Sequence, residues 1–245
     1  MSNKLLFGFH AVGVRLKVQP KSVLEVFFDP SRRDQRMRQF AQRAEQAGVR
    51  LVESDDARLT KMCGSPRHQG VVARVEARVL SHSLDDTLDE AVGDPLVLVL
   101  DGITDPHNLG ACLRVADGAG ACAVIAPKDH AVGLNATVAK VASGAAETVP
   151  YFMVTNLART LNELKERSIR IIGLADDAPQ SLFALPLRGP LALVLGAEGS
   201  GLRQLTRKTC DDLAQLPMLG AVESLNVSVA SGICLYEALR QRSIA

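Results

Sequence analysis

The chain has 245 residues, of which 47% are apolar, and its net charge is +1 at neutral pH. The composition allows a normal packed core and offers no apolar run long enough to cross a membrane, and the absence of tryptophan argues against an aromatic platform for single-stranded nucleic acid. The charge is uneven, because residues 1–80 hold 15 Lys and Arg against 8 Asp and Glu, whereas residues 81–245 hold 13 against 19. Such asymmetry indicates that the basic segment meets a polyanion.

Residues 1–80 are predicted to form a small α/β unit. Its expected elements, in chain order, are a helix at 8–16, a strand at 23–29, a helix at 32–48 ended by Gly48, a strand at 49–54, a helix at 56–64 capped by Asp55 or Asp56, and a strand at 70–78. The second helix is expected to carry five arginines, namely Arg32, Arg33, Arg36, Arg38 and Arg43. A charge run of this kind is ordinarily a solvated face, and the alternative is a face that contacts phosphates.

An acidic stretch separates this unit from the rest of the chain. Residues 81–95 carry five acids and no Lys or Arg, and this change of composition marks a linker or a surface helix between domains. The sequence therefore predicts one domain at 1–80, a linker at 81–94 and a second domain at 95–245.

Strands and helices alternate throughout the second domain. The expected strands are at 96–102, 121–127, 147–154, 169–176, 191–196 and 213–218, and the expected helices are at 108–120, 135–144, 156–167, 203–208 and 222–242. This alternation predicts an α/β fold with a parallel sheet that is covered by helices on both faces.

Cysteine usage indicates a reducing compartment. The five cysteines are an odd number and form no CxxC motif, and no cluster of His and Cys has the spacing of metal ligands. The sequence therefore predicts a cytoplasmic, metal-free protein that does not insert into a membrane.

Three polar loops follow strands of the second domain. Residues 101–110 contain Asn108, a normal helix cap, and lead to Arg114, which lies either on the exposed side of a helix or in a site. Residues 196–201, GAEGSG, place Glu198 among three glycines, and a glycine loop after a strand is where open α/β sheets bind ligands. It is neither a Walker loop nor GxGxxG, so it predicts a ligand that needs no phosphate-binding lysine. Residues 217–226 end with Ser224 and Asn226, either of which can cap the last helix.

The three loops lie in segments that resemble the signature motifs of the SpoU branch of the SPOUT RNA methyltransferases. The segments are DGITDPHNLGACLRVADGAG, LVLGAEGSGL and LPMLGAVESLNVSVASGICLYEA, in this order within residues 95–242. GFHAV near the start and HQGVVARV before the acidic stretch resemble the substrate-binding domain of the bacterial 23S rRNA guanosine 2′-O-methyltransferases of that branch. The resemblance implies a parallel-sheet domain with a deep trefoil knot, a small N-terminal RNA-binding domain and a homodimer.

The resemblance also implies a reaction and its residues. The cofactor would be S-adenosylmethionine, and the product would be a 2′-O-methylated guanosine of 23S rRNA, in the peptidyl-transferase region, made on free rRNA or on a ribosome assembly intermediate. The cofactor-binding positions of the family match Gly196, Leu216, Met218 and Leu225. Its conserved polar positions, which we expect to be catalytic, match Asn108, Arg114, Glu198, Ser224 and Asn226.

Methyl transfer to a ribose hydroxyl requires alignment of the reactants and loss of the hydroxyl proton. Because a guanidinium is always protonated, we expect Arg114 to bind a phosphate beside the target ribose and to lower the pKa of the hydroxyl by its charge. Glu198 would position Arg114 or a loop, and the remaining polar residues would orient the hydroxyl.

The sequence also bears on three other functions. The N-terminal domain disfavours a tRNA 2′-O-methyltransferase of the same branch. The intact polar residues of all three motifs disfavour a catalytically silent RNA-binding or ribosome-assembly factor. The missing GxGxxG motif disfavours a nucleotide-dependent oxidoreductase.

Overall fold

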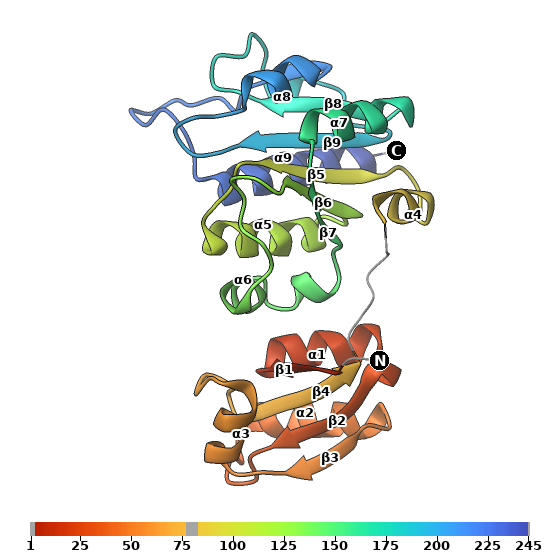
Figure 1. The fold of residues 1–245 in the computed structure, drawn as a ribbon, viewed down its shortest axis with the longest axis vertical. Coiled ribbons are helices and arrows are strands. Elements are labelled where there is room, and N and C mark those ends of the chain that lie inside the picture. Colours follow the sequence, from red (N-terminus) through yellow and green to blue (C-terminus); the bar gives the residue numbers. More distant parts are fainter. Residues whose placement is uncertain (1–2, 77–82, 245) are drawn as a thin grey trace. The chain divides into compact units, whose positions relative to one another are not determined.

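The computed structural model describes residues 3–76 and 83–244. The chain divides into two compact units, Met1–Leu80 and Ser81–Ala245, which are drawn in Figure 1. Each unit has its own sheet and its own hydrophobic core.

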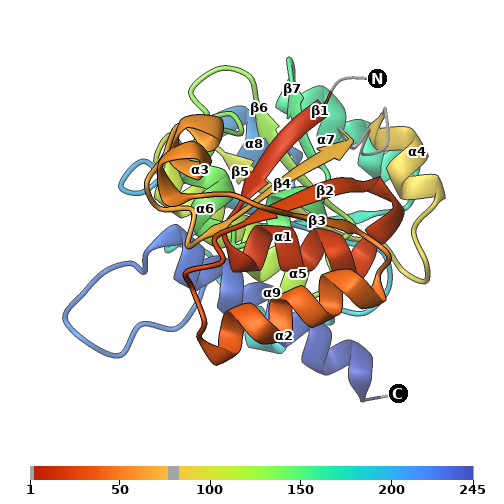
Figure 2. The same ribbon diagram turned by 90° about the horizontal axis from the view of Figure 1, so that it is seen from below.

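The first unit is a four-stranded mixed sheet with helices on both faces. The strands, in spatial order β1-β4-β2-β3, are β1 (Asn3–Phe7), β4 (Val71–Glu76), β2 (Val23–Phe28) and β3 (Arg50–Glu53). The helices are α1 (Phe9–Val18), α2 (Gln35–Gln46) and α3 (Asp56–Cys63), with a 3₁₀ turn at Pro20–Ser22. Strands β2 and β3 are parallel, and the other two pairings are antiparallel. Helices α1 and α2 lie side by side on one face (Figure 2), where their apolar side chains form the main core of the unit.

The predicted elements of this unit are present, with two differences. Strand β1 was not predicted, because its five residues precede a helix directly and pair only with distant β4. Helix α2 begins at Gln35, because the side chain of Asp34 accepts a hydrogen bond from the backbone N–H of Met37 at 3.1 Å. Arg32 and Arg33 therefore precede the helix that was expected to carry them. The predicted strand end at residues 77–78 lies outside the described residues.

The second unit is a six-stranded parallel sheet, which confirms the predicted α/β class. Its strands, in spatial order, are β10 (Asp212–Ala214), β8 (Arg170–Leu174), β9 (Leu191–Gly196), β5 (Leu96–Asp101), β6 (Ala123–Pro127) and β7 (Tyr151–Val154). Its helices are α4 (Leu84–Asp89), α5 (Pro106–Gly118), α6 (Ala136–Val141), α7 (Leu157–Glu166), α8 (Gln204–Thr209) and α9 (Val227–Ser243), with 3₁₀ turns at Ala145–Glu147 and Leu182–Ala184.

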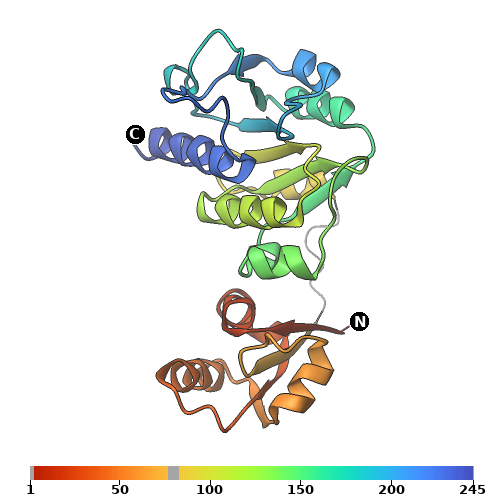
Figure 3. The same ribbon diagram turned by 90° about the vertical axis from the view of Figure 1, so that its left-hand side faces the viewer.

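Helices cover both faces of this sheet, as Figure 3 shows. In β5, Leu98 and Leu100 belong to a core shared with α5, α6 and α9, whereas Val97 and Val99 belong to a core shared with α4 and α7. This division follows from the alternation of side chains along a strand, and it explains why the central strands read as continuous apolar runs.

Three of the boundaries that differ from the prediction lie in the polar loops. Helix α5 begins at Pro106 with Asp105 as its cap, so Asn108 is not the cap. Strand β10 ends at Ala214, so Leu216 and Met218 lie in the following loop. Helix α9 begins at Val227 and is capped by Asn226 rather than by Ser224.

The acidic segment was predicted to be a linker or a surface helix between domains, and part of it forms α4. Leu88 of α4 packs into the core that contains Val97 and Val99 of β5. Residues 81–82 of that segment lie outside the described residues. The trefoil knot stays a prediction.

All five cysteines are free, and burial raises the pKa of Cys112 to about 11 and that of Cys234 to about 12.

Candidate active site

The first two polar loops meet because their strands are neighbours. Strand β5 pairs in parallel with β9, and the last residues of the two strands, Asp101 and Gly196, are partners in the register. The chain leaves both strands at the same edge of the sheet, where parallel α/β sheets bind their ligands. The residues that follow the two strands therefore lie together although they are far apart in the sequence.

Glycine is required in the loop after β9 because the backbone folds back on itself. The N–H of Gly201 donates to the carbonyl of Ala197 at 2.9 Å. A Cβ atom at Gly196 would lie 2.1 Å from the carbonyl carbon of Gly201, which no side chain can tolerate. Gly199 and Gly201 have φ of +80° and +63°, in the left-handed region that favours glycine. These three positions therefore favour glycine, and the loop is a narrow turn.

An ion pair between a buried carboxylate and an exposed arginine holds the far end of this loop. The side chain of Asp101 is fully buried and accepts from the Nε of Arg203 at 2.6 Å and from the backbone N–H of Arg203 at 3.0 Å. Two hydrogen bonds from one residue fix both the side chain and the backbone of Arg203. Sequence reasoning missed this pair, although Asp101 ends a strand next to the loop.

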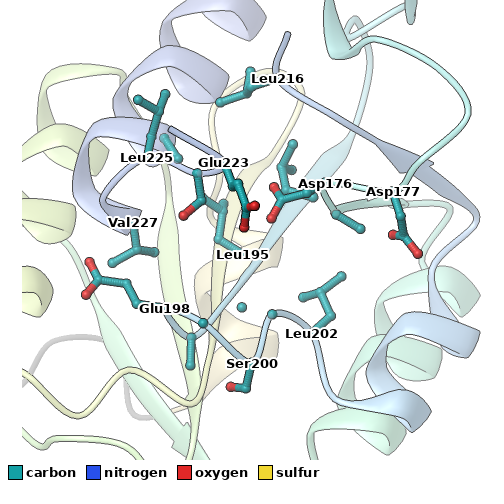
Figure 4. A pocket seen from close by; sticks show the side chains of 18 of the residues that line it. Asp176, Asp177, Leu195, Glu198, Ser200, Leu202, Leu216, Glu223, Leu225 and Val227 are labelled. Carbon is teal, nitrogen blue, oxygen red and sulfur yellow. The ribbon is translucent and has the colours of Figure 1, made fainter. Parts of the chain in front are cut away.

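A cavity of about 410 Å³ opens beside the glycine loop (Figure 4). Its walls come from the end of β8, the glycine loop, and the loop and first turn around the start of α9. All four residues that were predicted to bind the cofactor line it, namely Gly196, Leu216, Met218 and Leu225. The volume lies in the range of ordinary small-molecule sites.

The charge in this cavity is predominantly negative. Its lining includes four carboxylates and one arginine, namely Asp176, Asp177, Glu198, Glu223 and Arg207. Arg207 is bonded to Asp177 through both guanidinium nitrogens at 2.7 and 3.0 Å, and this contact holds the pKa of Asp177 below its usual value. The remaining three carboxylates have no cation beside them in the cavity lining. A pocket with this charge, lined by carboxylates together with several apolar side chains, suits a cationic ligand without phosphate groups.

Three of the predicted catalytic residues form one hydrogen-bonded cluster at the rim of the cavity. The Nδ2 of Asn226 donates to the Oδ1 of Asn108 at 2.9 Å and to the Oε1 of Glu198 at 2.7 Å. The Nδ2 of Asn108 also donates to Glu198, at 3.3 Å. Asn226 can do this because its Oδ1 caps α9 by accepting from the N–H of Ser228, which leaves its amide nitrogen free to donate. Asn108 is available because Asp105 caps α5 in its place.

The other two predicted catalytic residues are not part of this cluster. Ser224 lines the cavity. Arg114 lies exposed on α5 and, within the described part of the chain, has no hydrogen bond and no ion pair. The carboxylate of Glu198 contacts the two asparagines and not the Arg114 of its own chain.

No metal site accompanies the cluster. Among residues 3–76 and 83–244, no group of three or more His, Cys, Asp and Glu side chains is arranged to hold an ion. No described helix combines the length and the apolar character needed to span a bilayer.

Comparison with known proteins identifies the family. Residues 95–236 match the family model of the SpoU rRNA Methylase family, and residues 5–79 match the model described as RNA 2′-O ribose methyltransferase substrate binding. The 23S rRNA (guanosine-2′-O-)-methyltransferase RlmB of Ralstonia nicotianae is 62% identical over 242 residues, covering 99% of this chain and 97% of that protein. RlmB of Photobacterium profundum is 50% identical over 245 residues and covers both chains fully.

Solved structures agree in fold. A crystal structure of an RNA 2′-O ribose methyltransferase has a TM-score of 0.78 at 27% identity, covering 99% of this chain and 90% of that one. The SpoU methyltransferase AviRb from Streptomyces viridochromogenes, crystallised with its cofactor AdoMet, has a TM-score of 0.77 at 23% identity, covering 99% of this chain and 92% of that one. The resemblance inferred from the three motifs is confirmed, and the chain belongs to the SpoU rRNA methylase family.

Proposed function

We propose that this protein transfers a methyl group from S-adenosylmethionine to the ribose 2′-hydroxyl of a guanosine in 23S rRNA, in the peptidyl-transferase region. The observation that carries the proposal is the acidic cavity beside the glycine loop, with the cluster of Asn108, Glu198 and Asn226 at its rim. The relatives of 50–62% identity that bear the name of this activity support the choice of substrate.

The residues of the cavity fit the proposed cofactor. S-adenosylmethionine supplies a methyl group on a positively charged sulfur, carries no phosphate, and has an adenine ring that is flat and largely apolar. Leu216, Met218 and Leu225 would enclose the adenosine, and the backbone beside Gly196 would hydrogen-bond to it. The unpaired carboxylates of the cavity lining would attract the cationic part, which accounts for a glycine loop without a lysine.

The polar cluster would orient the nucleophile. An in-line displacement requires the ribose oxygen, the methyl carbon and the sulfur to be aligned, and fixed hydrogen-bonding groups supply most of that alignment. The side chains of Asn108, Glu198 and Asn226 already hold one another in place, and Ser224 lies beside the same cavity. The hydroxyl must also lose its proton, and a guanidinium cannot accept it. We therefore assign Arg114 to a phosphate next to the target ribose, where its charge lowers the pKa of the hydroxyl.

In a homodimer, Arg114 of one subunit would reach the site of the other subunit. Arg114 is exposed on α5, and the neighbouring α9 exposes Val229, Tyr236 and Leu239, which are spaced to lie on one side of that helix. The hydroxyl of Tyr236 lies over Gly118 of α5, so the two helices share one surface. We propose that a second copy of the chain covers this surface and that the partner subunit's Arg114 completes each site.

The two units would have different functions. We propose that residues 1–80 bind the RNA, that 81–94 link them to the rest, and that 95–245 bind the cofactor and catalyse the transfer, on free 23S rRNA or on an assembly intermediate. The protein would then act in the cytoplasm, where ribosomes are assembled.

Two measurements test the proposed function. Titration calorimetry should detect binding of S-adenosylmethionine to the full chain, which neither a silent assembly factor nor an oxidoreductase predicts. Mapping of 2′-O-methyl groups on rRNA and tRNA from cells with and without the gene should show one guanosine of 23S rRNA that loses its methyl group. Loss of a tRNA methyl group instead would favour the tRNA alternative, and no loss from 23S rRNA would refute the proposal.

A further inference from the structure

A basic groove of about 670 Å³ runs between α1 and α2 in the first unit. Its base includes the rings of Phe9 and Phe40, which are buried and meet edge to face with their centroids 5.5 Å apart. Gly13 widens it, because a Cβ atom at that position would meet nothing within 4 Å. The two helices that form the walls lie side by side in Figure 2.

The groove carries cations that form no ion pair within the described residues. Lys17, Arg36 and Arg43 line it together with His10, and no acidic side chain among the described residues does so. Lys17, Arg36 and Arg43 form no ion pair in the described part of the chain, whereas Arg32 nearby pairs with Asp34 at 2.6 Å. Unpaired cations gathered in one hollow produce a local positive potential that attracts an anion.

The spacing of these groups matches the spacing of phosphates along a nucleic-acid strand. On α2, Arg36, Gln39, Arg43 and Gln46 recur at intervals of three or four residues and therefore form one stripe along the groove. Arg36 and Arg43 lie two helical turns apart, about 10.5 Å along the axis, and a stacked nucleic-acid strand places about three phosphates over that length. The guanidinium of Arg36 is held 4.6 Å from the centroid of the Phe9 ring, so little side-chain entropy is lost when it binds an anion.

A second hollow of the same unit has the opposite charge. It is lined by the four carboxylates of Asp29, Glu53, Asp55 and Asp56 and by Arg58. A polyanion is repelled there. Of these two hollows of the described first unit, the α1–α2 groove is therefore the one whose charge is complementary to RNA.

We infer that the α1–α2 groove binds the phosphate backbone of a single RNA strand away from the methylated nucleotide. The inference rests on the proposed function, because it takes RNA as the substrate, and it goes further in naming the surface and the part of the RNA that it contacts. The contact is independent of sequence. It fixes where the RNA lies on the protein, and the choice of guanosine is left to the second unit.

The test is the salt dependence of binding of the full chain to a 23S rRNA transcript. The double variant Lys17→Gln/Arg43→Gln removes two groove cations that are exposed and unpaired. The matched control Arg58→Gln/Lys61→Gln removes two exposed cations of α3 in the same unit and leaves the same net charge. Thermal melting of both variants checks that they fold.

The groove variant should bind about tenfold more weakly at 0.15 M salt, and its slope of log K against log salt should be shallower by about 1.4, since two phosphate contacts are lost. The control variant should keep the slope of the wild type. The inference is overturned if both variants bind the transcript with equal affinity, or if the groove variant keeps the slope of the wild type. An acidic protein partner would then be the expected ligand of the groove. Failure of the proposed function would be recognised separately, as a wild-type chain that neither binds S-adenosylmethionine nor methylates the transcript.

Discussion

At the scale of single residues, one buried carboxylate holds the glycine loop in shape. The Asp101→Asn substitution keeps the size of the side chain but removes the charge that accepts two hydrogen bonds from Arg203. We expect it to lower the free energy of unfolding by about 2 kcal/mol and to weaken binding of S-adenosylmethionine, because the loop beside the cavity loses its anchor. Chemical denaturation and calorimetry measure the two effects. Asp177→Asn breaks an exposed ion pair at the same cavity and should leave stability nearly unchanged; an equal loss in both variants would contradict the anchoring role.

The residues of the site could be predicted to different degrees. Gly196 and Glu198 were identified because glycines around a carboxylate are unusual for a turn. The role of Asn108 as a cap was wrong, and the sequence held the reason: Asp105 followed by Pro106 is a strong helix start. The carboxylates Asp176 and Glu223 could not be found, because they meet only when two loops far apart in the sequence fold over one cavity.

At the scale of elements, the C-terminal half of α9 fastens the loop before β9. The amide of Gln241 donates to the carbonyl of Leu185 at 3.1 Å and its oxygen accepts from the N–H of Leu187 at 2.9 Å. The guanidinium of Arg242 donates to the carbonyls of Asp94 and Gly189, next to the starts of β5 and β9. The last helix therefore holds together the two strands from which the site projects.

Glu237 makes the free energy of unfolding depend on pH. Hydrogen bonds from Arg240 and Gln241 lower its pKa to about 2 in the folded protein, from a usual value of 4.5. A lowered pKa means that the carboxylate stabilises the fold above pH 4.5 and that this contribution is lost as the pH falls from 4.5 towards 2. The wild type should therefore be more stable than Glu237→Gln at pH 7, and the difference should shrink in that window. Denaturant unfolding of both proteins from pH 7 to pH 3 tests this, and a difference that stays constant with pH would contradict it.

Periodicity predicted the order and type of most elements, and tertiary contacts set the boundaries that it missed. The end of β10 was placed too late because Leu216 and Met218 continue an apolar pattern, yet both line the cavity after the strand has ended. Strand β1 has too few residues to show its own period, and its pairing with β4 joins residues about seventy positions apart.

At the scale of the whole molecule, the proposed dimer predicts complementation between two inactive variants. Arg114→Ala leaves the cavity intact, and Glu198→Ala leaves Arg114 intact. If the partner subunit's Arg114 completes each site, mixing and exchanging the two variants should restore about a quarter of wild-type activity, since half of the dimers would be mixed and each mixed dimer would have one complete site. Methylation of a 23S rRNA transcript measures the recovery, with sedimentation velocity as the control for dimerisation. Two variants that stay inactive after proven exchange would place Arg114 in its own subunit's site.

The pairing of β5 with β9 also sets the order of events during synthesis. Leu100 pairs with Leu195, so the sheet edge that bears the site cannot close until about 95 further residues have left the ribosome, and the start of α9 must follow. The first unit is complete much earlier and can fold while the rest is still being made. A nascent or truncated chain would therefore acquire its affinity for RNA before it acquires any capacity to methylate it.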